Sequence, residues 1–256
     1  MIRAVLLDLD DTLVVEEAAA QATFAATAAT AAERHAIDPG ALARDARTRA
    51  RELWRAAPTH PYCERVGISS WEGMWCRFEG ESDDVPALRR WAPAYRREAW
   101  RGALADQGIE DDRLAEELAD RFGAERRARH ETFADAAPAL DALAARYALA
   151  LVTNGASCLQ REKLAASGLA DRFDAVIVGG DVGVGKPDRR IFERALEAVS
   201  ASADEAVMVG NNLSKDVEGA LAAGVRAIWV NREGEPVPPR VLAVRDLDEL
   251  PALLSS

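Results

Sequence analysis

The segment Ala4–Thr12, which reads AVLLDLDDT, is the most informative part of this sequence. A short apolar run of this kind is typical of a buried strand. Along a strand, Asp8 and Asp10 point to the same side, so their like charges repel each other at the edge of the sheet. A divalent cation such as Mg²⁺, which prefers carboxylate oxygens, would offset this repulsion. A solvated turn, in which Asp and Thr bond to nearby backbone, explains the segment equally well when it is taken alone.

Four more apolar runs follow the first strand, which is predicted over residues 4–9, and amphipathic helical patterns accompany them. The predicted strands cover residues 148–152, 175–178, 206–209 and 225–230, and the predicted helices cover residues 138–146, 158–166, 189–198 and 214–223. This alternation is typical of a parallel sheet with helices on both faces. We therefore predict an α/β fold with a doubly wound parallel sheet.

The long interval between the first two strands has a different pattern. Residues 16–133 show no convincing strand and are rich in Ala, Arg, Glu and Trp. A crossover between parallel strands needs only about a dozen residues, and this interval is many times longer. We therefore expect an inserted all-α domain over residues 16–133, and an α/β core formed by residues 1–15 and 134–256.

Composition narrows the classes of partner. The net charge of −11 would repel nucleic-acid phosphates, and no stretch gathers Lys and Arg regularly, so we expect no nucleic-acid partner. Cys63, Cys76 and Cys158 are widely spaced and suggest neither a disulfide framework nor a zinc site. The apolar run before Asp8 is too short for a signal peptide, and the Ala-rich residues 18–36 carry too many polar groups for a membrane span. We expect a cytoplasmic protein without a membrane partner.

Specific polar residues follow four of the predicted strands at their carboxyl ends, where open α/β sheets bind ligands. These clusters are Asp8, Asp10 and Thr12; Thr153, Asn154 and Gly155; Lys186 before Pro187; and Asn211 with Asp216. The Thr153 hydroxyl and the backbone N–H groups that follow it suit an anion, although a plain helix N-cap fits them as well. A lone Lys such as Lys186 is usually a surface charge. Because all four clusters are expected at one edge of the sheet, a binding site is favoured over these separate explanations.

In this order, Asp8-x-Asp10-Asp11-Thr12, Thr153-Asn154-Gly155, Lys186-Pro187 and Gly210-Asn-Asn-x-x-x-Asp216 resemble the motifs of the haloacid dehalogenase (HAD) superfamily. The resemblance spans nearly the whole chain, and the helical insert resembles the C1 cap of that superfamily. It implies a HAD-like Rossmannoid core and an Mg²⁺-dependent phosphatase that acts on a small phosphorylated metabolite. The oligomeric state expected is a monomer or a homodimer.

The resemblance also implies roles for individual residues. Asp8 would attack phosphorus and form an aspartyl phosphate, and Asp10 would act as general acid and base. Lys186 would balance the negative charge of Asp8 and the phosphate. The catalytic residues implied are Asp8, Asp10, Thr153 and Lys186; the phosphate-binding residues are Asp11, Thr153, Asn154, Gly155 and Lys186; and the metal ligands are Asp8, Asp10, Asn211 and Asp216.

Two positions, Asp10 and Asn211, bear on which activity within the superfamily this chain has. Asp10 is the acid that dehalogenases of the superfamily lack, so it favours a phosphatase over a HAD-fold dehalogenase. Asn211 stands where the fourth motif commonly has Asp, so the metal site loses one formal charge and Mg²⁺ should bind more weakly. A phosphomutase, or a non-catalytic phosphate-binding protein with a weakened metal site, stays open as an alternative.

Overall fold

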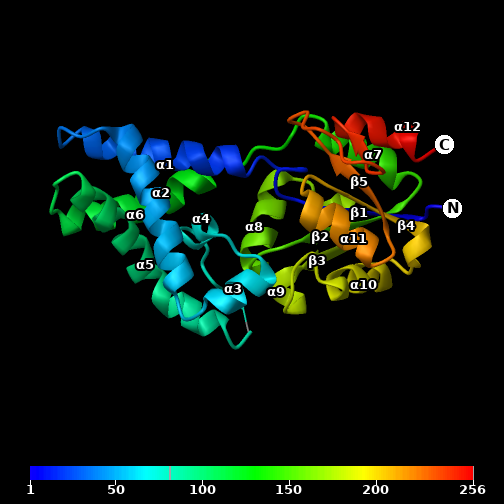
Figure 1. Cartoon of the computed structure of the whole chain (residues 1–256), viewed down its shortest axis with the longest axis horizontal. Coiled ribbons are helices and arrows are strands. Elements are labelled where there is room, and N and C mark those ends of the chain that lie inside the picture. Colours follow the sequence, from blue (N-terminus) through cyan, green and yellow to red (C-terminus); the bar gives the residue numbers. More distant parts are fainter. Residues whose placement is uncertain (81, 256) are drawn as a thin grey trace. The chain divides into compact units, whose positions relative to one another are not determined.

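The computed structural model describes residues 1–80 and 82–255. The chain forms two compact units (Figure 1). One unit combines Met1–Val15 with Glu131–Ser256, and the other consists of Glu16–His130. The first unit has the predicted α/β fold, and the second is a helical insertion.

The sheet of the α/β unit has six parallel strands in the order β3-β2-β1-β4-β5-β6. The strands are β1 (Ala4–Leu7), β2 (Ala148–Thr153), β3 (Ala175–Val178), β4 (Ala206–Gly210), β5 (Arg226–Val230) and β6 (Leu242–Val244). The predicted parallel sheet is therefore confirmed, and β6 extends it by one strand. In the register of the central strands, Leu7 lies beside Leu151 and Val209. The residues that follow these three strands consequently meet at one edge.

Helices cover both faces of this sheet (Figure 1). The helices are α7 (Ala136–Ala144), α8 (Ser157–Ser167), α9 (Gly179–Val182), α10 (Arg189–Ala198), α11 (Gly219–Ala222) and α12 (Leu250–Leu253), with 3₁₀ turns η1 (Ala170–Arg172), η2 (Ala203–Glu205) and η4 (Leu247–Glu249). Leu140 of α7 joins the apolar cluster on one face with Leu7, and Phe192 of α10 joins the cluster on the other face with Leu6. Alternate residues of β1 thus face opposite layers.

The segment after β4 differs from the single helix predicted over residues 214–223. It begins as a π-helical segment, η3 (Leu213–Glu218), and continues as α11. The Asn212 carbonyl accepts hydrogen bonds from the amides of both Asp216 and Val217, at 2.8 and 3.3 Å. Such a widened turn holds one extra residue per turn, and π-helical turns are often found at functional sites.

The helical unit contains α1 (Glu17–Ala32), α2 (Pro39–Ala56), α3 (His60–Val66), α4 (Ser70–Gly73), α5 (Val85–Asp106) and α6 (Asp112–Arg127). The four long helices pack in the pairs α1 with α2, α1 with α6, α2 with α5, and α5 with α6. Aromatic rings fill this core: Phe24 lies 4.6 Å from Phe122 and 6.0 Å from Trp100 between ring centroids. Such rings contribute large apolar area, so they stabilise a small helical unit.

Within the described residues, no helix combines the length and the apolar character that a membrane span requires. Cys63, Cys76 and Cys158 form no disulfide in the described part of the chain, and the first two are buried. Burial raises the pKa of the Cys63 thiol to about 12, so this thiol stays protonated at neutral pH.

Candidate active site

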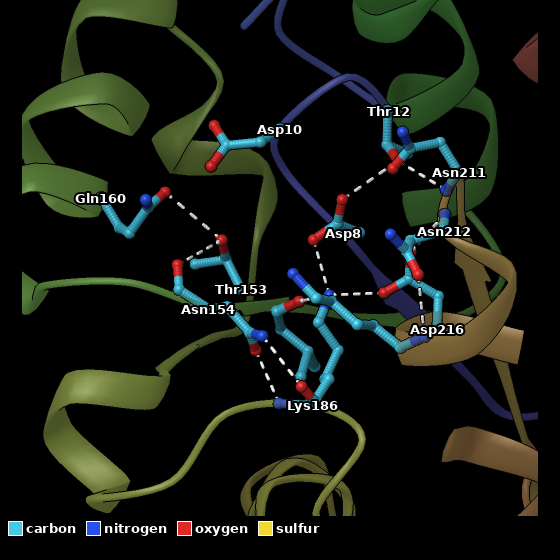
Figure 2. A network of polar contacts seen from close by, with 12 residues as sticks. Asp8, Asp10, Thr12, Thr153, Asn154, Gln160, Lys186, Asn211, Asn212 and Asp216 are labelled. Carbon is cyan, nitrogen blue, oxygen red and sulfur yellow. Dashed lines mark hydrogen bonds and ion pairs between the residues drawn. The ribbon is translucent and has the colours of Figure 1, made fainter. Parts of the chain in front are cut away.

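Asp8 lies at the carboxyl edge of the sheet, directly after β1 (Figure 2). The residue is 7% exposed, and its carboxylate contacts two side chains. Oδ1 accepts a hydrogen bond from Lys186 Nζ at 2.5 Å, and Oδ2 accepts one from the Thr12 hydroxyl at 3.2 Å. Charge-assisted bonds of this kind fix the carboxylate in place.

The Lys186 ammonium sits between two carboxylates. Besides Asp8, its Nζ lies 2.7 Å from Asp216 Oδ1 and donates to the Val152 carbonyl at 2.6 Å. Burial by itself lowers the pKa of this lysine, but the charges of Asp216 and Asp8 outweigh burial and raise the pKa above its usual value. Lys186 therefore stays charged at neutral pH.

Asp216 projects from the π-helical segment η3 toward the same point. Its Oδ2 accepts from the Asn212 amide at 2.9 Å, while its Oδ1 is buried and makes an ion pair with Lys186 but no well-directed hydrogen bond. Burial raises the pKa of Asp216 to about 6, the Lys186 charge opposes that rise, and the Asp8 charge adds to it. A Cβ on Gly210 would lie 2.3 Å from Asp216 Oδ2, so only glycine leaves room for this carboxylate.

Asn154 holds the main chain of Lys186 through its side chain. Its Nδ2 donates to the Lys186 carbonyl at 2.9 Å, and the Lys186 amide donates to Asn154 Oδ1 at 2.6 Å. The sequence predicts a phosphate contact for the Asn154 main chain, but it does not predict this paired contact of the side chain with Lys186. On the other side of the loop, Gly219 packs against Pro187, where an added Cβ would lie 2.8 Å from the proline ring.

Thr153 and Gly155 flank Asn154 in the chain. The buried Thr153 hydroxyl lies 3.3 Å from Gln160 Oε1 and 3.2 Å from the Asn154 carbonyl, and its single proton can serve one of them at a time. Gly155 has a φ of 115°, and a Cβ there would meet Gln160 Nε2 at 2.6 Å. The close approach of Gln160 therefore requires glycine at this position.

Asp10 pairs with a second lysine, Lys163, which the sequence motifs do not predict. Lys163 Nζ of α8 donates to both carboxylate oxygens of Asp10, at 3.0 and 3.1 Å. Asp8 and Asp10 are thus neutralised by different lysines of the chain, so a bound cation is not required to offset their repulsion. One signal in the sequence was the position of Lys163, four residues after Leu159 and on the buried face of α8.

The remaining predicted residues lie in the turn after β1 and at the end of β4. The Asn211 amide donates to the Thr12 hydroxyl at 3.0 Å, and that hydroxyl lies 3.3 Å from Asn211 Oδ1. Thr12 thus links Asn211 to Asp8. Asp11 adopts a φ of 57°, and its main-chain amide donates to the Val14 carbonyl at 2.7 Å. That amide is used to close the turn.

The oxygen donors at this site suit Mg²⁺, which keeps several water ligands, better than they suit a metal whose ligands all come from the protein. No group of three or more His, Cys, Asp and Glu side chains able to hold a metal occurs in the described part of the chain. Mg²⁺, however, usually takes one or two carboxylates and keeps several waters. Asp8 and Asp216 supply two carboxylates, the latter with a buried Oδ1 that lacks a hydrogen bond, and Asn211 supplies a neutral oxygen.

Comparisons with known proteins identify the family of the chain. The family described as haloacid dehalogenase-like hydrolase matches residues 2–224. The chain is 42% identical to the phosphoserine phosphatase of Thermus thermophilus over 252 residues, which cover 97% of both chains. The magnesium-bound HAD-hydrolase YfnB of Bacillus subtilis superposes over 100% of this chain and 99% of its own, with a TM-score of 0.66 and 24% identity.

A 2-haloacid dehalogenase of Pseudomonas syringae superposes with a TM-score of 0.62 and 28% identity, over 100% of this chain and 99% of its own. The shared fold therefore does not separate the two activities. The family match and the phosphatase relative together show that the chain belongs to the haloacid dehalogenase-like hydrolases and is a phosphatase of that family.

Proposed function

We propose that this phosphatase hydrolyses the phosphate monoester of a small metabolite, with phosphoserine as the first candidate, through an aspartyl phosphate on Asp8. The observation that carries the proposal is the position of Lys186 Nζ, 2.5 Å from Asp8 and 2.7 Å from Asp216 at the carboxyl edge of the sheet. A fixed ammonium beside a nucleophilic carboxylate would stabilise the negative charge that an incoming phosphoryl group brings.

In the first step, one Asp8 oxygen attacks phosphorus and the bond to the leaving alkoxide breaks. Asp10 gives the alkoxide a proton, which yields the free alcohol. In the second step, Asp10 takes a proton from water, and the water oxygen attacks the aspartyl phosphate. Inorganic phosphate leaves, Asp8 is restored, and Asp10 is protonated again for the next cycle.

Three further groups would bind the phosphoryl oxygens in this scheme. The Thr153 hydroxyl lies at the end of β2, and the backbone amides of Asn154 and Gly155 lie on the loop that follows, next to Lys186. The Asn154 side chain would act by holding Lys186 in position. We assign no phosphate contact to Asp11, because its amide is bonded to Val14 and its carboxylate would repel the substrate.

Magnesium completes the proposed site. The Asp8 and Asp216 carboxylates, the Asn211 side-chain oxygen and the Asp10 carbonyl would hold it. When bound, Mg²⁺ would neutralise charge on the phosphoryl group during transfer.

The phosphoserine assignment follows the relative from Thermus thermophilus, which is similar over nearly its full length. To test it, the purified chain is assayed for phosphate release from phosphoserine, from a sugar phosphate and from a nucleoside monophosphate, with Mg²⁺ and with EDTA. We expect Mg²⁺-dependent release that is fastest with phosphoserine. Isomerised substrate without phosphate release would indicate a phosphomutase, and chloride release from a 2-chloro acid would indicate a dehalogenase. Ligand-dependent thermal stabilisation without turnover would indicate a binding protein.

A further inference from the structure

Lys163 takes no part in the mechanism proposed above, yet its side chain ends at Asp10. Its Nζ lies 3.0 and 3.1 Å from the two carboxylate oxygens. The lysine side chain is 1% exposed, whereas that of Asp10 is 26% exposed. Burying an ammonium is costly unless the charge is paired, so a lysine here indicates that the contact with Asp10 is built into the fold.

Lys163 projects from the face of α8 that meets the site. Gln160 lies one turn earlier on the same helix face and contacts the Thr153 hydroxyl at 3.3 Å. One face of α8 therefore presents side chains to two of the motifs of the site. Arg161, on the same helix, is instead half exposed and pairs with Asp181 at 2.8 Å.

Figure 2 shows the Asp10 carboxylate turned away from Asp8 and outside the network around Lys186. The two carboxylates are therefore held independently, each by its own lysine. Contact with both oxygens of Asp10 restricts rotation of its side chain. Such restriction matters for a group that transfers protons, because a misplacement of about 1 Å can cost about a hundredfold in rate.

We propose that Lys163 is a positioning residue for this phosphatase: its ammonium holds the Asp10 carboxylate in the orientation from which Asp10 transfers protons. The inference rests on the proposed function, since it assumes that Asp10 is the acid and base. Lys163 should therefore affect the chemical steps and should not affect substrate binding.

The test is a double-mutant cycle on kcat. Lys163→Met, Asp10→Asn and the double variant are assayed at saturating Mg²⁺ with phosphoserine, or with whichever alkyl phosphate the wild type hydrolyses fastest. We expect Lys163→Met to lower kcat by about tenfold to a hundredfold, with KM changed by less than about threefold. In the Asp10→Asn background the same substitution should change kcat by less than about twofold, because there is no longer a proton-transferring group to position.

Arg161→Met is the matched control, since it removes a cation from the same helix away from the site, and it should leave kcat unchanged. Circular dichroism checks the fold of each variant, and Lys163→Gln replaces Lys163→Met if the latter does not fold. A wild-type kcat in Lys163→Met, or an equal loss in both backgrounds, would overturn the proposal. So would a failure of both Lys163 variants to fold, which would make the residue structural. Full turnover by Asp8→Asn would instead refute the proposed function. No outcome of the double-mutant cycle gives that result, so the two failures can be told apart.

Discussion

Lys186 is held by three oxygen atoms, and two of them belong to the carboxylates of Asp8 and Asp216. This arrangement explains why several carboxylates can lie close together here. Lys186 pairs with Asp8 and Asp216, and Lys163 pairs with Asp10. Lys186 and Lys163 provide the positive charge that the sequence alone suggested would come from a metal. In the proposed site, Asn211 and Asp216 would then determine how tightly Mg²⁺ binds.

Asn211→Asp adds an anionic oxygen beside Thr12 and Asp8, so it should strengthen Mg²⁺ binding. We expect the Mg²⁺ concentration for half-maximal activity to fall by about tenfold, which corresponds to about 1.4 kcal/mol. Titration of activity with Mg²⁺ measures this change. The matched control is Asn212→Asp, because Asn212 Oδ1 accepts from the Lys215 amide at 2.9 Å as a helix cap, a role that Asp also fills. An unchanged requirement in Asn211→Asp would argue against ligation at this position.

The pKa of Asp216, raised to about 6 by burial, predicts how Mg²⁺ binding depends on pH. Below that pKa the carboxyl is protonated, and Mg²⁺ must displace the proton; above it, the carboxylate is free to bind. We therefore expect the Mg²⁺ concentration that gives half-maximal thermal stabilisation to be about fourfold higher at pH 5.5 than at pH 7.5. Equal values at the two pH values would contradict a role for Asp216 as a ligand.

At the scale of elements, the end of β4 and the π-helical segment η3 place Asp216. The sequence predicted one regular helix here, because the spacing of apolar residues does not report the extra residue in a turn. That turn depends on contacts made only in the folded chain, such as the bond from the Asn212 amide to Asp216. Strands β1 to β5 and the helices α7, α8 and α10 were predicted to within a few residues, since their apolar periodicity is set by burial on the two faces of the sheet.

Gly210→Ala tests the packing of these two elements. The new Cβ would lie 2.3 Å from Asp216 Oδ2, so the buried carboxylate must move. We expect a loss of about 1–3 kcal/mol in the free energy of unfolding, measured by denaturant titration, together with a large loss of activity. Gly102→Ala in α5 is the control, because its nearest neighbour is the flexible Arg49 side chain at 3.4 Å, and Ala favours a helix. Wild-type stability and activity in Gly210→Ala would refute this account of Asp216.

At the scale of the whole molecule, parallel strands and their register bring residues far apart in sequence to one edge. Asp8 and Asn211 follow β1 and β4 directly, and Thr153 is the last residue of β2; these three strands are neighbours in the sheet. Their meeting was therefore predictable from the strand pattern and from the rule that such sheets bind ligands at their carboxyl ends. Lys163 was not predicted, because which helix face meets which loop depends on how α8 packs on the sheet.

Ligand binding at this edge should stabilise the folded chain. At about 100 times its dissociation constant, a ligand adds about 2.7 kcal/mol, and inorganic phosphate with Mg²⁺ should then raise Tm by roughly 5–10 °C. Differential scanning calorimetry at increasing phosphate concentration measures the shift. In Lys186→Met the shift should be lost, since the ammonium that would bind the phosphate is removed. No shift in the wild type would argue against a phosphate site.

Trapping the enzyme during turnover shows directly whether Asp8 becomes phosphorylated. Wild-type enzyme is mixed with phosphoserine and Mg²⁺, quenched in acid within the first turnover, digested and examined by mass spectrometry. We expect one added phosphoryl group on the peptide that contains Asp8, and none in Asp8→Asn, which should also lack turnover. Phosphate release by Asp8→Asn at the wild-type rate, or a phosphoryl group on a different residue, would contradict the account.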